Sequence, residues 1–257
     1  MPIQGRILGS LALLSLAAGC TVSSTSGDGS MPVDLRSSAD LRRPTVGKPD
    51  AAATQPGYFD RVGQLVDVPV RKYFGTSYGK LAEGLSNKDA NIRRSSLLGL
   101  STSYGARDTS NLAAYRAIGQ FDPDPLVRAA AIRAINISRD NASGPTIVSA
   151  LKDGHPAVQL EVLKALANMP QAGVDESLRK IVADENIDID NRIAAADALR
   201  HYRSVNNARA LIDLLDGENF GLAWQARRSL YLMTGKDFRY NRSDWLGFIT
   251  GPGNPVG

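Results

Sequence analysis

The stretch that decides the fold is DPDPLVRAAAIRAI, residues 122–135. It opens with aspartates and prolines, which favour helix starts, and continues with small and aliphatic residues. Val127, Ala131, Ala134 and Ile135 lie 0, 4, 7 and 8 residues from a common start. These positions share one face of a helix with 3.6 residues per turn. The stretch therefore predicts an amphipathic helix whose small residues let a neighbouring helix approach closely.

The same pattern occurs five times. The starts lie at residues 92, 127, 158, 191 and 222, which are 35, 31, 33 and 31 residues apart. The seventh residue after each start is small, and the eighth is Leu100, Ile135, Leu166, Leu199 or Leu230. A second apolar pattern precedes each start, so every unit reads as a helical hairpin of helix A and helix B. One hairpin cannot cover both of its apolar faces, whereas a stack can. The sequence predicts an all-α solenoid of five hairpins.

Three of the five turns share an aspartate three residues before the helix start and an arginine four residues after that aspartate. These pairs are Asp89/Arg93, Asp124/Arg128 and Asp188/Arg192. We expect each aspartate to cap its helix B. The acid-to-base spacing also predicts ion pairs within the helix, worth about 0.2–0.5 kcal/mol each. His155 occupies the third turn, where we expect it to be solvated or to cap the helix.

Two of these stretches resemble a known repeat. Residues 122–135 and the stretch DNRIAAADALR, residues 190–200, are similar to helix B of HEAT repeats, in the short form of phycobilisome-lyase HEAT-like repeats. The ending, with LMTGKDFRY at residues 232–240 and Trp245-Leu246, resembles HEAT-repeat lipoproteins of planctomycete-type bacteria. The similarity covers roughly residues 77–249. It implies a right-handed α-α superhelix, related to armadillo-like helical folds, in an exported protein, but it implies no ligand.

The N-terminus has the pattern of an export signal. Arg6 precedes an apolar run over residues 7–18, about 12 residues, which is too short to span a bilayer core of about 30 Å. The segment LAAGC, residues 16–20, resembles a bacterial lipobox, which implies cleavage before Cys20 and lipidation of its sulfur. Thr21 stands where retention in the inner membrane favours aspartate, so the resemblance implies the outer membrane, facing the periplasm. The alternative is an ordinary signal peptide with an incidental cysteine.

These patterns divide the chain into five parts. They are a lipoprotein signal peptide (1–19), a disordered tether rich in Ser, Thr, Gly, Pro and Asp (20–56), an N-terminal cap (57–76), five HEAT-like repeats (77–235), and a C-terminal cap and tail (236–257). Aromatic residues cluster in both caps, where we expect them to cover the apolar faces of the terminal repeats. The alternative is that they line a ligand pocket.

Residues for catalysis or cofactor binding are scarce. Two histidines and one cysteine do not make a typical zinc site, and we expect no cofactor. The segment GTSYGK, residues 75–80, is one residue short of a phosphate loop and lacks the hydroxyl after the lysine, so it reads as a helix start. We expect no enzyme, with a lyase-like activity as the minor alternative. The net charge of +4 is small for a nucleic-acid-binding protein, and export would remove that ligand.

The outward face of the B helices holds the candidate site. Positions two, six and nine after each start point away from the packed face. They include the candidate partner-binding residues Arg94, Arg133, Lys164, Arg200, Trp224, Arg228 and Tyr231. Arginine, tryptophan and tyrosine are common binding anchors. The sequence favours a membrane-anchored periplasmic scaffold that binds a protein or peptide. The alternatives are a solvated charged face, or an accessory subunit or enzyme acting on an anionic polysaccharide or lipid of the envelope.

Overall fold

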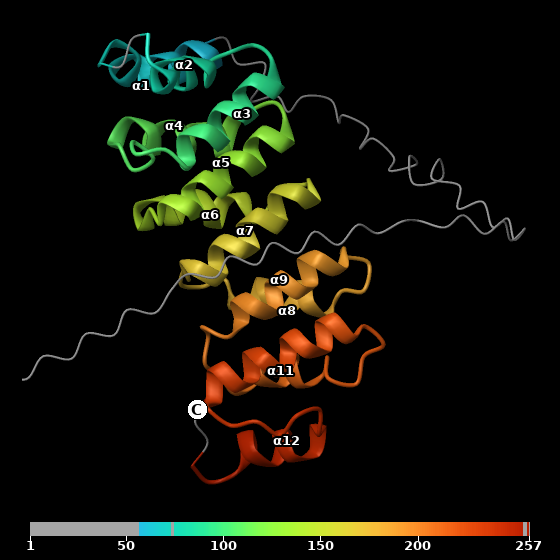
Figure 1. The fold of residues 1–257 in the computed structure, drawn as a ribbon. Coiled ribbons are helices and arrows are strands. Elements are labelled where there is room, and N and C mark those ends of the chain that lie inside the picture. The colour runs from blue at the N-terminus through green and yellow to red at the C-terminus, as the bar shows by residue number, and fades with distance from the viewer. Residues whose placement is uncertain (1–56, 73–74, 254–255, 257) are drawn as a thin grey trace, which may run out of the picture. The chain divides into compact units, whose positions relative to one another are not determined.

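The computed structural model describes residues 57–72, 75–253 and 256, and this part of the chain contains helices and no strand. The signal peptide, Cys20 and the tether lie outside the described residues. The helices are α1 (Tyr58–Lys72), α2 (Ser77–Gly84), α3 (Ala90–Ser101), α4 (Thr109–Phe121), α5 (Pro125–Ser138), α6 (Gly144–Ala150), α7 (Pro156–Asn168), α8 (Asp175–Ala183), α9 (Ile189–Leu199), α10 (Val205–Ile212), α11 (Phe220–Thr234) and α12 (Arg242–Thr250) (Figure 1).

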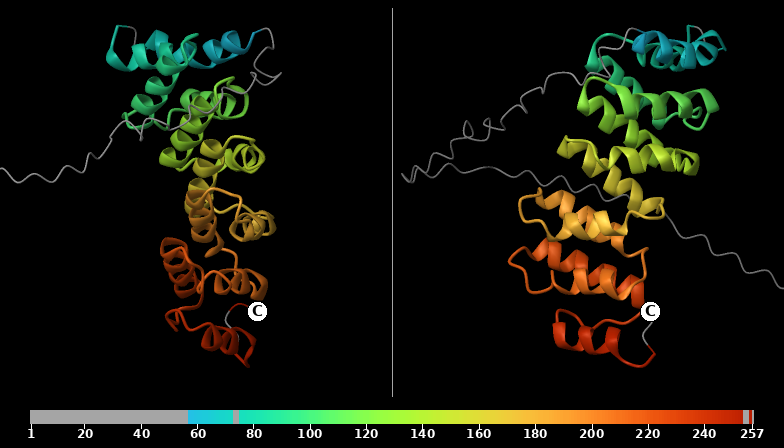
Figure 2. Two further views of the ribbon diagram at one scale, coloured as in Figure 1. Left: turned by 90° about the vertical axis from the view of Figure 1, so that its right-hand side faces the viewer. Right: turned by 180° about the vertical axis from the view of Figure 1, so that it is seen from behind.

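The described helices form five hairpins that stack in chain order. Helices α2/α3, α4/α5, α6/α7, α8/α9 and α10/α11 are the expected A/B pairs. The B helices α3, α5, α7, α9 and α11 each pack against the next one, and the two layers of helices are visible in Figure 2. The all-α solenoid expected from the sequence is confirmed. At the two ends, α1 packs against α2 and α4, and α12 packs against α10.

The aliphatic residue of each B helix lies in one continuous core. Leu100, Ile135, Leu166, Leu199 and Leu230 are all fully buried in the same hydrophobic cluster. The small residues beside them allow this packing. A Cβ atom on Gly99 would lie 2.9 Å from methyl carbons of the Leu81 side chain in α2, closer than real Cβ atoms come. The pattern of small and aliphatic residues therefore sets how closely the two helices of a hairpin approach each other.

One position of the pattern was predicted wrongly. Ile92, the start residue of the first repeat, is 42% exposed, whereas the start residues of the other four repeats are buried. The reason is its place in the stack. Helix α3 is the first of the B layer, so no earlier helix B covers this residue.

The predicted helix caps are confirmed. The side chains of Asp89, Asp124 and Asp188 accept hydrogen bonds from backbone N–H groups in the first turns of α3, α5 and α9. His155 caps α7 through Nδ1, and Asn219 caps α11. Each helix B thus begins at a polar side chain that accepts from an N–H group without a partner in the helix.

The predicted ion pairs within the B helices are wrong. Arg93 binds Asp122, and Arg128 binds Asp153, so each arginine reaches the turn of the next repeat. Arg192 donates instead to the carbonyl oxygen of Val182 at 3.1 Å. The capping aspartates already accept from backbone N–H groups, and the arginines are directed towards the neighbouring turn. Two of these arginines therefore join repeats rather than stabilise their own helix.

Among these contacts between repeats, the one made by Asp122 is the most buried. Its carboxylate accepts two hydrogen bonds of 2.7 Å from Arg93 and one of 2.6 Å from the hydroxyl of Tyr58 in α1. The side chains of Arg93 and Asp122 are only 2% and 0% exposed. Burial, followed by the Asp122 carboxylate, raises the pKa of Tyr58 above its ordinary value, so Tyr58 remains a donor. One carboxylate thus joins the N-terminal cap and the first two repeats.

We predict that Asp122→Ala lowers the free energy of unfolding by about 3–5 kcal/mol, because it leaves the Arg93 guanidinium buried without its counter-charge. The matched control is Asp89→Ala, which removes a helix cap alone and should cost about 1 kcal/mol. Urea unfolding followed by circular dichroism measures both values. Equal losses in the two variants would contradict the role given to Asp122.

Candidate functional site

The seven candidate residues all lie along the B layer, but they do not form one continuous site. Arg94, Arg133 and Lys164 come from α3, α5 and α7 and line one hollow. Trp224, Arg228 and Tyr231 come from α11 and line a second hollow. Arg200, at the C-terminal end of α9, lines neither of these two. It is half-buried and donates to the carbonyl oxygen of Ala167 at 2.7 Å, so it ties α9 to α7.

The first hollow, called here the α5 trough, has a volume of about 510 Å³. It is lined by Asn91, Arg94, Ser95, Leu98 and Ser101 of α3, Leu126, Ala129, Ala130 and Arg133 of α5, and Ala157, Leu160, Glu161 and Lys164 of α7. In the N-terminal half of α5 the trough is lined by Leu126, Ala129 and Ala130, and Leu98 of α3 and Leu160 of α7 add apolar side chains on the two sides. Leu98 is 56% exposed. The trough therefore presents an apolar surface to solvent on a layer of packed helices.

Charged side chains surround this apolar surface. Arg133 donates to both carboxylate oxygens of Glu161, at 3.1 Å from Nε and 2.7 Å from Nη2. Lys164 donates to the same carboxylate at 3.2 Å. Arg94 donates to the amide oxygen of Asn91 at 3.0 Å. Three cations and one carboxylate line the trough, so it carries an excess of positive charge.

Glu161 is a residue of the trough that the sequence did not reveal. Its side chain is 5% exposed, although those of Arg133 and Lys164 are about half exposed. Burial raises the pKa of Glu161, but the hydrogen bonds and charges of Arg133 and Lys164 outweigh burial and lower it below its ordinary value. Glu161 therefore stays charged near neutral pH and fixes the two cations in place. Only the contact across repeats distinguishes this residue from an ordinary helix-surface glutamate.

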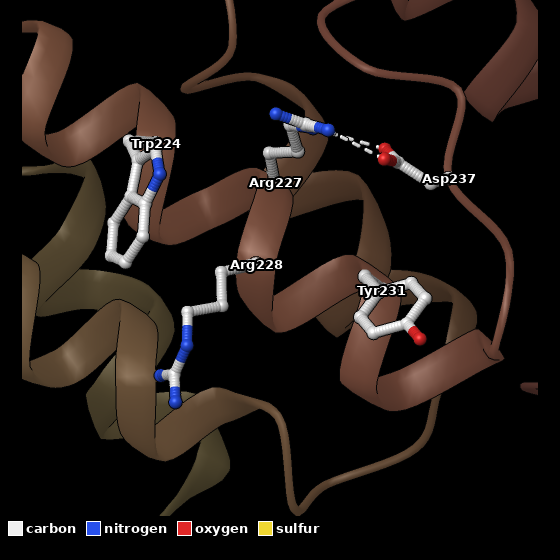
Figure 3. A pocket seen from close by; sticks show the side chains of 5 residues that line it. All are labelled: Trp224, Arg227, Arg228, Tyr231 and Asp237. Carbon is white, nitrogen blue, oxygen red and sulfur yellow. Dashed lines mark hydrogen bonds and ion pairs between the residues drawn. The ribbon is translucent and has the colours of Figure 1, made fainter.

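The second hollow, called here the α11 hollow, is smaller, at about 220 Å³. Trp224, Arg228 and Tyr231 project from successive turns of α11 (Figure 3). Arg227 and Asp237, which the sequence did not single out, complete the lining and form two hydrogen bonds of 3.0 and 2.5 Å. Arg227 also lies over the ring of Tyr240, at 5.4 Å from its centroid. The arginine is thus held in a fixed position beside two exposed aromatic rings.

The charges of the α11 hollow are also paired. Arg227 lowers the pKa of Asp237 to about 2, with the hydrogen bond as the largest cause. Arg228 lies 3.1 Å from the carboxylate of Asp197 in α9. Most cations among the candidate residues thus have a carboxylate beside them, which the pattern of outward positions alone did not indicate.

Other chemistry has little support in the described residues. No group of three or more His, Cys, Asp and Glu side chains is placed there to hold a metal ion. His201 lies 2.9 Å from the carbonyl oxygen of Ala167 through Nε2. Thr76 accepts from the backbone N–H of Gly79, so the segment 75–80 starts helix α2 as expected. In the part of the chain that is described, no helix combines the length and the apolarity needed to cross a membrane.

These features define an all-α solenoid of two-helix repeats with a hollowed helix-B face. A family model described as HEAT repeats matches residues 112–200, a segment that includes most of α4 and extends through α9. Residues 112–200 therefore match HEAT repeats, and the structure repeats the same hairpin on both sides of that segment. Comparison with curated proteins gives no match. HEAT repeats generally act as scaffolds for protein interaction and are typically non-catalytic.

We predict that Glu161→Gln destabilises the protein in a pH-dependent way. The folded-state pKa of Glu161 is lowered, so its charge stabilises the fold above the unfolded-state pKa of about 4.3, and this contribution disappears as pH falls through the folded value. The loss at pH 7 should be about 1.5 kcal/mol, because the partner cations are half exposed. Urea unfolding at pH 7, 5, 4 and 3 should show the difference between the two proteins shrinking. A difference that stays constant or grows towards pH 3 would contradict this.

Proposed function

We propose that this protein is a membrane-anchored scaffold of the bacterial cell envelope that holds a partner protein on its helix-B face. One observation carries the proposal. The outward positions of the B helices form the α5 trough and the α11 hollow, and both combine exposed apolar or aromatic side chains with fixed cations. Such a combination is typical of the anchor residues at protein interfaces.

The rigidity of the B layer supports this role. Arg133 and Arg228 bind carboxylates on neighbouring B helices, 28 and 31 residues away in the sequence. These contacts hold the surface side chains before any partner arrives, which reduces the conformational entropy lost on binding. An exposed apolar surface held in this way costs free energy in isolation, and a partner that covers it recovers that cost.

The anchor in this proposal is Cys20. The lipobox-like segment at residues 16–20 supports cleavage and acylation at this cysteine. Two or three acyl chains hold a protein on a membrane stably, whereas one chain binds only marginally. The residues that follow would then act as a tether between the outer membrane and the solenoid in the periplasm.

A second candidate function is an accessory role on an anionic envelope component. The observation that favours it is the excess of cations in the α5 trough together with the aromatic rings of the α11 hollow. Binding of this kind would need no protein partner, and it would weaken steeply as salt is added. The apolar lining of the α5 trough favours the scaffold, because an anionic sugar or headgroup does not use it.

We predict that the triple variant Arg133→Gln, Lys164→Gln and Arg228→Gln loses its partner and keeps its fold. Glutamine removes the positive charges and keeps a polar side chain at each position. Affinity recovery from the native membrane, with circular dichroism of the purified variant, tests both parts.

The matched control is the triple variant Arg107→Gln, Lys180→Gln and Arg209→Gln, which removes three exposed cations from outside the B helices. It should recover the partner as the unmodified protein does. If both variants recover the partner equally, the partner does not bind the helix-B face through these cations.

We predict that Cys20→Ser releases the protein from the membrane fraction. The unmodified chain should show an N-terminal peptide that begins at an acylated Cys20, detected by mass spectrometry. A mature N-terminus that carries an unmodified cysteine would exclude the lipid anchor, whereas binding of a partner on the helix-B face would remain possible.

A further inference from the structure

The α5 trough is formed by three neighbouring B helices, which together present a surface for one further helix. Helices α3 and α7 flank α5 in the B layer (Figure 1). Packed helices lie about 8–10 Å apart, so the axes of α3 and α7 are about 16–20 Å apart. A helix with its side chains is about 10–12 Å wide. Helices at this spacing leave no gap of that width between α3 and α7, so a further helix would lie on top of α5 and reach the outward side chains of both neighbours.

The side chains along the trough favour binding of such a helix. The alanines Ala129 and Ala130 are the smallest side chains that line the trough from α5, so a partner backbone can approach closely over the N-terminal half of this helix. Leu98 and Leu160 stand on the two sides. Leu98 departs from the other repeats, where the same helix position holds Arg133, Lys164, Asp197 or Arg228. This leucine is more than half exposed, and nothing in the described fold needs an apolar side chain there.

The charges around the trough indicate which charge a bound partner should carry. Glu161 accepts from Arg133 and Lys164, which leaves an excess of positive charge on the rim. Arg94 forms no ion pair with a described carboxylate and donates only to the Asn91 amide. A carboxylate at the edge of an apolar partner surface would complement Arg94 on one side and the Arg133–Lys164 pair on the other.

We propose that the α5 trough binds an acidic amphipathic helix of the partner protein. The apolar stripe of that helix packs on the alanines between Leu98 and Leu160, and its flanking Asp or Glu side chains pair with Arg94 and Arg133. The proposal rests on the scaffold function and names the chemistry of its partner. A lipid surface does not fit the trough as well, because a depression of about 510 Å³ cannot admit a flat layer of headgroups.

A peptide-display selection against the full chain in detergent micelles tests this proposal. The library holds helical peptides of about 18 residues, or five turns, with a fixed leucine stripe and flanks open to Asp, Glu, Lys and Gln. We expect the selected peptides to carry Asp and Glu beside the stripe. Leu98→Asn should weaken their binding about tenfold or more, whereas the control Tyr104→Asn, at an exposed loop residue, should leave it unchanged.

A charge swap gives the sharper test. Arg94→Glu should reject the acidic peptides and select Lys at the flank that faces residue 94, whereas the control Arg209→Glu on α10 should keep the original selection. Selection of Lys or Gln flanks by the unmodified chain, binding that ignores Leu98, or the absence of any selected peptide would overturn the proposal. The proposal would also be overturned if no peptide is selected and the unmodified chain binds vesicles of anionic phosphatidylglycerol, with Arg94→Glu abolishing that binding. The scaffold function fails separately, if the triple glutamine variant keeps its native partner.

Discussion

The rest of this structure depends on one constraint: a single helical hairpin cannot bury both of its apolar faces. Each hairpin covers its neighbour, and the aliphatic residues from Leu100 to Leu230 meet in one core. The small residues on each helix B make this close contact possible. Because every B helix turns its small and aliphatic stripe inward, the residues six places after each start lie together on the opposite face of the layer. The candidate binding face is thus a geometrical consequence of the stacking.

Polar contacts between neighbouring repeats also hold the stack together. Arg93–Asp122 and Arg128–Asp153 join consecutive turns, and Arg133–Glu161 joins consecutive B helices on the outer face. All of them connect residues that are about one repeat apart, as expected where each repeat touches only its neighbours. The buried junction at Asp122 also fixes the cap helix α1. The contacts on the outer face have a second consequence, because they hold the rim of the α5 trough in place.

The sequence predicted the fold more fully than the site, for a physical reason. Helix periodicity, small residues and caps are local features, so the five hairpins and the roles of Asp89, Asp124 and Asp188 followed from spacing. The partners of Arg93 and Arg128 lie a repeat away, and local spacing wrongly favoured the nearer aspartates. Glu161 likewise binds Arg133 of the preceding repeat, so local spacing does not single it out. Periodicity identifies the outward residues, but the two hollows also include Glu161 and Asp237, which only the folded chain brings beside them.

The central claim is that partners bind on the helix-B face of the solenoid, and site-specific photo-cross-linking in the native membrane tests it most directly. A photoreactive amino acid is placed at Leu98 on α3 or, as a matched position, at Arg209 on α10. Both side chains are exposed, but only Leu98 lies in the α5 trough. The account predicts a protein adduct at residue 98 and none at residue 209. Adducts that form at residue 209 and not at residue 98 would contradict it.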